Sequence, residues 1–139
     1  MKDVPEGFRA IPRLSPFNTL VGPLFERRSG EDISIGLHVE EKHTNSRGIC
    51  HGGVLATLAD LALGYSLQAK GGESARYVTA QLSIDYAGSA KLGDWIESTV
   101  EVQRVGARLA FANGYLVAGG RRIVRASAIF ARAGNTGDA

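Results

Sequence analysis

The alternation of apolar and polar residues from residue 33 to residue 39 predicts the first strand of this chain. Apolar side chains occupy every second position there, with small or polar residues between them: Ile33, Ile35, Leu37 and Val39. A repeat of two is that of a β-strand, because successive side chains point to opposite faces of a sheet. We therefore expect a strand that buries one of its faces.

The segment from residue 52 to residue 70 has a different pattern, which predicts a long helix. Its apolar residues cover most of a helical wheel, and this is typical of a helix that is largely buried. Its polar positions lie three, four and four residues apart and form one narrow stripe: Thr57, Asp60, Gly64 and Gln68. We expect Gly71 and Gly72 to end the helix.

Four further strands are predicted after the helix, at about 77–86, 95–105, 109–118 and 121–131. Short turns rich in glycine separate them, at 88–94, 106–107 and 119–120. Turns as short as these favour antiparallel neighbours. The order of elements therefore predicts an α+β fold in which one curved antiparallel β-sheet wraps around a long central α-helix.

The first 29 residues are expected to form an arm that contains one short helix. Ser15 and Pro16 provide an N-cap followed by proline at the first helical position, and Gly22 marks the end of this helix. The glycine-rich end of the chain is expected to be a flexible tail. We divide the chain into an arm, a single domain and the tail, with the boundaries 1–29, 30–133 and 134–139.

Length and composition are those of one globular domain. The chain has 139 residues and is 44% hydrophobic, which is enough for a packed core. Its N-terminus has no apolar signal segment and no run of about 18 apolar residues occurs, so we expect a cytoplasmic protein without a membrane anchor. A net charge of +2 gives no argument for nucleic acid as a partner. Cys50 is the only cysteine and the three histidines lack the spacing of a metal site, so neither a disulfide nor a bound metal is expected.

The segment that is most informative about function runs from Asn45 into the long helix. Gly52 and Gly53 stand at the predicted helix start, where backbone N–H groups are unscreened and roughly half a positive charge resides. An oxygen that gains negative charge can be held there, which is the chemistry of an oxyanion hole. Asp60, on the polar stripe of the same helix, adds a carboxylate that can serve as a base or a nucleophile.

These residues carry a family resemblance. The layout, Asn45, the sequence His51-Gly52-Gly53 and the downstream Asp60 together resemble the hotdog-fold acyl-CoA thioesterases, specifically the phenylacetyl-CoA-type subgroup and its mammalian relatives. The resemblance covers about residues 30–132. It implies a hotdog fold and hydrolysis of an acyl- or arylacyl-CoA thioester to free CoA and a carboxylic acid. No cofactor is implied, because CoA is part of the substrate.

The resemblance also implies roles for individual residues. Gly52 resembles the backbone donor to the thioester oxygen, and Asp60 resembles the general base or nucleophile. Asn45 resembles the side chain that places the substrate or the water, and Thr79 matches a position at which relatives have a hydroxyl that orients the water. His51 is expected mainly to fix the loop, because a histidine cation is disfavoured just before a helix N-terminus.

Substrate contacts are expected at the helix start and on the last strands. After residue 100 arginines outnumber acidic residues, which favours an anionic ligand there or a solvated hairpin face. Arg104 and Arg108, with Gly53, are our candidates for binding the substrate, since CoA carries several phosphates. Arg121 and Arg122 remain alternatives. Apolar residues that fit either an acyl channel or a plain core are Leu55, Leu58, Tyr65, Trp95 and Phe111.

Each candidate also has a purely structural interpretation. Asp60 fits a solvated polar stripe, and Asn45 fits an Asx-turn within its loop. Thr79 is an ordinary β-former. Gly52 and Gly53 fit a site of tight packing, although adjacent glycines are a weak choice inside a helix.

The spacing of Gly52 and Asp60 predicts a dimer. Eight residues of helix span about 12 Å, whereas an oxyanion donor and an attacking group around one carbonyl lie within roughly 6–7 Å of each other. Gly52 of one subunit can instead face Asp60 of another across a two-fold axis, which produces two equivalent sites. The resemblance implies the same shared sites, and often a dimer of dimers.

Two other functions stay open at this point. One is a non-catalytic module that binds or senses acyl-CoA, although binding alone does not need a carboxylate such as Asp60 in an apolar cleft. The other is a hotdog-fold hydratase, although His51 followed by two glycines does not resemble the hydration motif. The acyl preference also stays open among aryl, hydroxyaryl and medium-chain groups.

Overall fold

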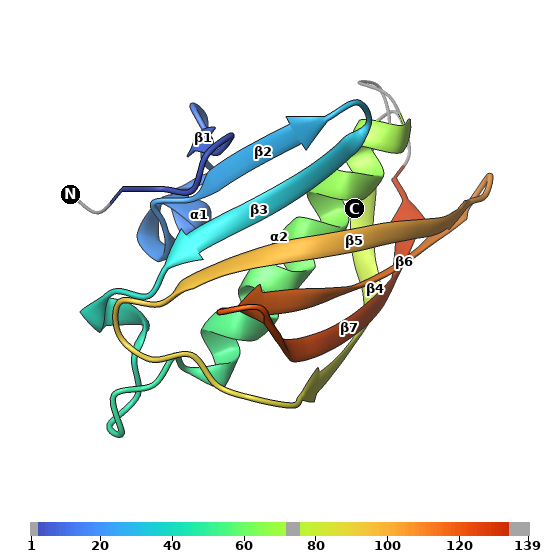
Figure 1. The fold of residues 1–139 in the computed structure, drawn as a ribbon. Coiled ribbons are helices and arrows are strands. Elements are labelled where there is room, and N and C mark those ends of the chain that lie inside the picture. The colour runs from blue at the N-terminus through green and yellow to red at the C-terminus, as the bar shows by residue number, and fades with distance from the viewer. Residues whose placement is uncertain (1–2, 72–75, 134–139) are drawn as a thin grey trace.

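A seven-stranded antiparallel sheet curves around one long helix (Figure 1). The computed structural model describes residues 3–71 and 76–133. The strand order is β1-β2-β3-β5-β6-β7-β4, which places β4 at one edge, hydrogen-bonded only to β7. The strands are β1 (Arg9–Ala10), β2 (Phe25–Ser29), β3 (Asp32–His38), β4 (Tyr77–Tyr86), β5 (Trp95–Val105), β6 (Leu109–Ala118) and β7 (Arg121–Arg132). The predicted α+β fold is confirmed.

The long helix α2 (Gly52–Gly71) forms the core together with the concave face of the sheet. It has the predicted start, and Gly71 is still helical, whereas Gly72 lies outside the described residues. Its buried side chains are Leu55, Leu58, Ala59, Ala62, Leu63, Ser66 and Leu67. Full burial of each leucine stabilises the fold by about 1.5–3 kcal/mol, which fixes the helix against the sheet. Among the described residues, no helix combines the length and the apolar character needed to cross a membrane.

The strands predicted by alternation lie where they were expected. Strands β4, β5 and β6 have the predicted bounds, β7 extends one residue further, and β3 begins one residue before Ile33. The β6–β7 turn uses Gly119 and Gly120 with φ of +57° and +75°. Both values lie in the left-handed region that glycine adopts at little cost, which explains the glycine pair at this hairpin.

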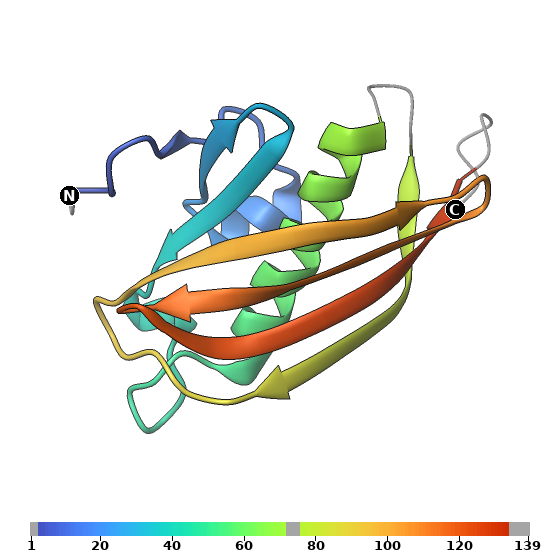
Figure 2. The same cartoon turned by 45° about the vertical axis from the view of Figure 1, so that its right-hand side comes forward.

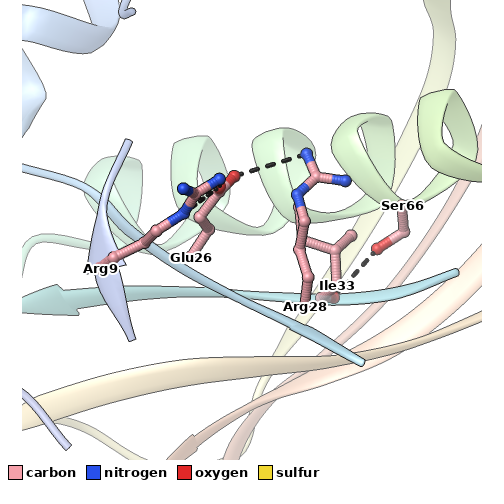
Figure 3. Close-up of polar contacts among 5 residues, drawn as sticks. All are labelled: Arg9, Glu26, Arg28, Ile33 and Ser66. Atoms are coloured by element: carbon pink, nitrogen blue, oxygen red, sulfur yellow. Dashed lines mark hydrogen bonds and ion pairs between the residues drawn. The ribbon is translucent and has the colours of Figure 1, made fainter. Parts of the chain in front are cut away.

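Two strands in the N-terminal segment, β1 and β2, also join the sheet, and the hydrophobic pattern does not predict them. Strand β2 pairs with β3 along its whole length, from Phe25 opposite Gly36 to Ser29 opposite Asp32. Its sequence is mostly charged and lacks alternation, because Glu26 occupies a buried position. The Glu26 carboxylate is held by Arg9 of β1 at 2.9 Å and by Arg28 at 3.4 Å (Figure 3).

Two short helical segments lie in the same half of the chain, one between β1 and β2 and one after β3. Helix α1 (Pro16–Val21) forms as predicted, and the Asn18 N–H donates to the Ser15 side-chain oxygen at 3.2 Å. A 3₁₀ turn, η1 (Glu41–His43), precedes the loop that leads to α2. Helix α2 lies between α1 on one side and β4 on the other (Figures 1 and 2).

Two buried serines replace missing ladder bonds where β3 and β5 diverge. The two strands pair only over three positions, at Gly36, Leu37 and His38 of β3. Beyond them the Ile35 N–H donates to Ser98 Oγ of β5 at 2.9 Å, and Ser66 Oγ of α2 donates to the Ile33 carbonyl at 3.4 Å (Figure 3). A buried backbone group without a hydrogen-bond partner is costly. The two serines supply these partners, so β3 and β5 can separate beyond Gly36 at little cost.

Candidate active site

The start of α2 leaves one backbone N–H group without an internal partner. The Val54 and Leu55 N–H groups donate to the His51 carbonyl at 2.9 and 3.1 Å, and the Gly53 N–H donates to His51 Nδ1 at 2.8 Å. Among the described residues, none accepts a hydrogen bond from the Gly52 N–H. Of the two glycines, Gly52 is therefore the one that offers a donor to a ligand.

His51 and His43 together hold the loop that precedes α2. His51 is exposed and accepts a hydrogen bond from the Gly53 N–H at Nδ1, and its own backbone N–H donates to the His43 carbonyl at 2.7 Å. His43 is buried, accepts from the Glu40 N–H at 2.9 Å through Nδ1, and donates through Nε2 to the Val21 carbonyl at the end of α1. The loop is thus tied to both η1 and α1.

Tyr86, at the end of β4, fixes the backbone of Gly52. Its hydroxyl donates to the Gly52 carbonyl at 2.7 Å. A Cβ atom on Gly52 would lie 3.4 Å from the Tyr86 ring, which is an ordinary contact. Tyr86 is the last residue of a predicted strand, and nothing in its local sequence indicates this contact.

The Asp60 and Thr79 side chains, both predicted to act at the site, meet in the structure. The Thr79 hydroxyl of β4 donates to Asp60 Oδ1 of α2 at 2.8 Å. A β-bulge follows directly, where the β4–β7 register shifts between Thr79 and Gln81. Asp60 is half-buried, and its Oδ2 has no hydrogen-bond partner among the described residues. One carboxylate oxygen is thus oriented while the other is available.

A cleft of about 290 Å³ lies beside Asp60. It is bounded by α1, α2, β4 and one residue of β7, and its walls are Asn18, Asp60, Leu61, Gly64, Tyr65, Gln68, Tyr77, Thr79 and Phe130. Of the apolar candidates for an acyl channel, Tyr65 lines this cleft, whereas Leu55 and Leu58 belong to the core and Trp95 packs edge-on against Phe8 at 5.0 Å. The cleft is large enough for a ring or a short chain, since about 150 Å³ suffices for benzene.

Asn45 forms the turn of its own loop. Its side-chain oxygen accepts the Arg47 N–H at 2.9 Å and, more weakly, the Ile49 N–H at 3.4 Å. This geometry matches the Asx-turn interpretation, and it leaves the side-chain NH₂ group for a substrate or a water.

Arg104 and Arg108 lie far from the start of α2 within one subunit. They are placed at the tip of the β5–β6 hairpin, whereas the loop before α2 bridges to Lys91, just ahead of the opposite end of β5 (Figure 2). Nine residues of strand, from Trp95 to Arg104, correspond to about 30 Å. The structure therefore does not bring either arginine to Gly52 of the same chain.

Other features near the site offer no reactive group. Burial raises the pKa of the Cys50 thiol to about 11, so at neutral pH it is a protonated core side chain rather than a nucleophile. Residues 3–71 and 76–133 contain no cluster of three or more His, Cys, Asp and Glu side chains that could hold a metal.

A larger cavity of about 810 Å³ contains none of the predicted site residues and is lined by Ala10, Pro23, Phe25, His38, Val39, Glu40, Glu41, Leu92 and Gly93.

Residues 47–125 match the family model of the thioesterase superfamily. This segment is more than half of the chain and includes Gly52, Asp60, Thr79 and Tyr86. The chain belongs to the thioesterase superfamily. It therefore has the hotdog fold of that family and is a hydrolase, as the resemblance implied.

Named relatives agree with this thioesterase assignment. The chain is 40% identical over 131 residues to "Putative esterase PA0474" of Pseudomonas aeruginosa, covering 94% of this chain and 98% of that one. It is 35% identical over 99 residues to acyl-coenzyme A thioesterase 13 of Mus musculus, covering 66% and 70%. The crystal structure of a hypothetical thioesterase with coenzyme A from Streptococcus pneumoniae superposes with a TM-score of 0.69 at 26% identity, covering 77% and 84%.

Proposed function

We propose that this thioesterase hydrolyses an acyl-CoA thioester to free CoA and a carboxylic acid, with Asp60 as the general base or nucleophile. The observation that carries the proposal is the Thr79–Asp60 hydrogen bond at the wall of the cleft. It orients one carboxylate oxygen and leaves Oδ2 open to a water or a substrate. The mouse relative named as an acyl-coenzyme A thioesterase and the neighbour solved with coenzyme A support CoA as the leaving group.

In the general-base route, Asp60 accepts a proton from water as the water oxygen bonds to the thioester carbon. The carbonyl oxygen becomes an oxyanion, which the Gly52 N–H stabilises with the partial positive charge of the helix start. The oxyanion then re-forms the carbonyl, the C–S bond breaks, and CoA leaves as a thiolate that takes up a proton. Thr79 positions the carboxylate, and Tyr86 positions the Gly52 backbone.

The site is proposed to be shared between two subunits. Gly52 and Asp60 are separated by about 12 Å along one helix, too far to act on one carbonyl. The edge strand β4 is a suitable place for a second subunit to bind. Within the described residues it is hydrogen-bonded only to β7, and most of its side chains are exposed. A two-fold axis there brings Gly52 of one subunit toward Asp60 of its partner. The same proposal includes a tetramer that is formed from two such dimers.

The remaining candidates take supporting roles. His51 holds the loop through the Gly53 N–H, and the NH₂ group of Asn45 helps to place the substrate or the water. Arg104 and Arg108 contact the CoA phosphates only if the partner subunit brings them to the site. For the acyl part, the size of the cleft and its Tyr65 and Phe130 walls support an aryl group of the phenylacetyl type.

The test is CoA release, followed with a thiol reagent, from a panel of phenylacetyl-, benzoyl-, hydroxybenzoyl- and short- to long-chain acyl-CoAs. Asp60→Asn should keep the fold and lose at least about 100-fold in kcat, as expected for a catalytic base. Asp32→Asn, an exposed aspartate at the start of β3, is the matched control and should retain activity. Saturable acyl-CoA binding without release would instead favour a binding module, and undiminished hydrolysis by Asp60→Asn would exclude its role.

A further inference from the structure

The cavity of about 810 Å³ is separate from the cleft beside Asp60, with which it shares no lining residue. Its aromatic wall is formed by Phe25 and His38, whose rings lie edge-on with centroids 6.5 Å apart. His38 lies on the face of the sheet that is turned away from α2, because its neighbour Leu37 is fully buried in the core. The volume is within the range of sites for small molecules, so the cavity is a second candidate binding site.

The His38 ring has a hydrogen-bond acceptor that is not used. Its Nε2 atom lies 3.1 Å from the Asp3 carbonyl. Because a carbonyl only accepts, Nε2 carries the hydrogen, and Nδ1 of the neutral ring is an acceptor. This Nδ1 atom is buried and has no partner in the described part of the chain. Buried polar groups are almost always paired, so a missing partner here indicates a ligand that brings a donor.

The charged residues of the cavity are both acidic. Glu40 and Glu41 are exposed, and neither forms an ion pair within the described residues. The lining residues include no lysine or arginine. Leu92 on the same wall is 56% exposed, which leaves an apolar surface uncovered. The walls therefore favour a ligand with an apolar body and a cationic donor, and they disfavour the polyanion CoA.

One wall of this cavity holds the loop that leads to Gly52. Glu41 is the first residue of η1, and His43 is the last. The His43 carbonyl accepts the His51 N–H at 2.7 Å, directly before Gly52. A ligand that contacts Glu41 thus lies against a turn that is bonded to the proposed oxyanion site.

The wall that contains Leu92 holds the same loop from the other side. The Cys50 N–H donates to the Ala90 carbonyl at 2.7 Å, and Ile49 pairs with Lys91 in an isolated bridge. The segment after β3, the loop before α2 and the segment before β5 accordingly meet at one end of the sheet (Figures 1 and 2). The cavity is bounded by two of these three segments, and the third leads into α2.

We propose that this cavity is an effector site that binds an apolar amine, and that the bound amine changes turnover at the Asp60 site through the loop before α2. The apolar body packs on Phe25 and Leu92, and the ammonium group lies among the two glutamates and His38 Nδ1. A ligand that favours one arrangement of the walls shifts the loop toward it, and small displacements of a reacting group have large effects on rate. The effect on turnover rests on the proposed function, whereas binding does not.

Calorimetric titration tests the binding. The probes are 4-phenylbutylamine and octylamine, each compared with the alcohol of the same carbon skeleton. Wild type should bind at least one amine about 5-fold or more tightly than its alcohol, because only the ammonium group gains ion pairs and charge-assisted hydrogen bonds. This preference should decrease as salt is added, since the glutamates are exposed.

Substitutions assign the preference to the cavity. The double variant Glu40→Gln with Glu41→Gln keeps the side-chain shapes and removes both charges, so its affinities for amine and alcohol should become nearly equal. The matched control is Glu31→Gln with Glu101→Gln, two exposed glutamates outside the cavity, and it should retain the preference. His38→Phe keeps a ring against Trp95 and removes Nδ1, so it should weaken both probes about 5-fold.

Turnover is then measured with saturating amine on an acyl-CoA that the wild type hydrolyses. The amine should change kcat by about 2-fold or more in wild type and in the control variant. The Glu40/Glu41 double variant should keep its activity and show no response. A rise in KM alone, retained in the double variant, would place the amine beside Asp60 and overturn the effector site.

The other outcomes separate this inference from the proposed function. Equal affinity for amine and alcohol in wild type overturns the effector site, and so does binding that leaves kcat unchanged. In both cases the thioesterase activity stands. Failure of the wild type to hydrolyse any thioester overturns the proposed function and the effect on turnover with it, whereas calorimetry still decides whether the cavity binds the amine.

Discussion

The Thr79 hydroxyl donates a 2.8 Å hydrogen bond to Asp60 Oδ1 and thereby joins the edge strand β4 to the central helix α2. The two residues are nineteen positions apart in the sequence, and the loop between α2 and β4 separates them. Because the bond uses one lone-pair direction of one oxygen, it sets the orientation of the other. A catalytic carboxylate benefits from this constraint, since reacting groups must be held in a narrow geometry.

Replacing Thr79 tests whether this orientation matters for turnover. Thr79→Val keeps the side-chain volume and removes the hydroxyl, so kcat should fall by about 10- to 100-fold, the equivalent of one hydrogen bond to a charged group. KM should change little, because the bond contributes to the reacting geometry rather than to substrate binding. Thr79→Ser retains the hydroxyl and should retain most of the activity. Equal kcat values for the valine and serine variants would contradict a positioning role.

The Gly52 N–H can be removed without disturbing other hydrogen bonds. Gly52 is the first residue of α2, a position where proline is well accepted, and none of the described residues accepts from its N–H. Gly52→Pro should therefore fold and lose about 100- to 1000-fold in kcat, as for other single oxyanion donors. Gly52→Ala keeps the N–H, and its Cβ makes only ordinary contact with Tyr86, so its kcat should stay within a few-fold of wild type. Similar activities of the two variants would rule out this donor.

Ser98 is predicted to stabilise the fold rather than the reaction. It is fully buried and accepts the Ile35 N–H at 2.9 Å where β3 and β5 diverge. Ser98→Ala leaves this backbone group buried without a partner, which should lower the free energy of unfolding by about 1–3 kcal/mol in urea denaturation. Ser127→Ala, at an exposed position on β7, is the control and should stay within about 0.5 kcal/mol of wild type. A Ser98→Ala variant as stable as this control would mean that water replaces the serine.

Local pattern predicts the elements of this protein well, because alternation and helical periodicity record which face of each element is buried. It fails at β2, where buried Glu26 is compensated by Arg9 of β1, seventeen residues earlier in the chain. The same limit applies to the site. Asp60 and Thr79 are recognisable from a family pattern, whereas the contact between the Tyr86 hydroxyl and the Gly52 carbonyl forms only when β4 lies beside the start of α2. Such contacts depend on tertiary structure and leave no periodic signal.

Mixed dimers test whether two subunits share each site. In a dimer of one Gly52→Pro subunit and one Asp60→Asn subunit, one shared site carries both substitutions and the other carries neither. Random pairing of equal amounts makes half of the dimers mixed, so the refolded mixture should regain about one quarter of wild-type activity, although each variant alone is nearly inactive. Sites contained within single subunits would leave the mixture as inactive as its components. Sedimentation at the assay concentration should show no active monomer, and an active monomer would exclude the shared site independently of the mixing result.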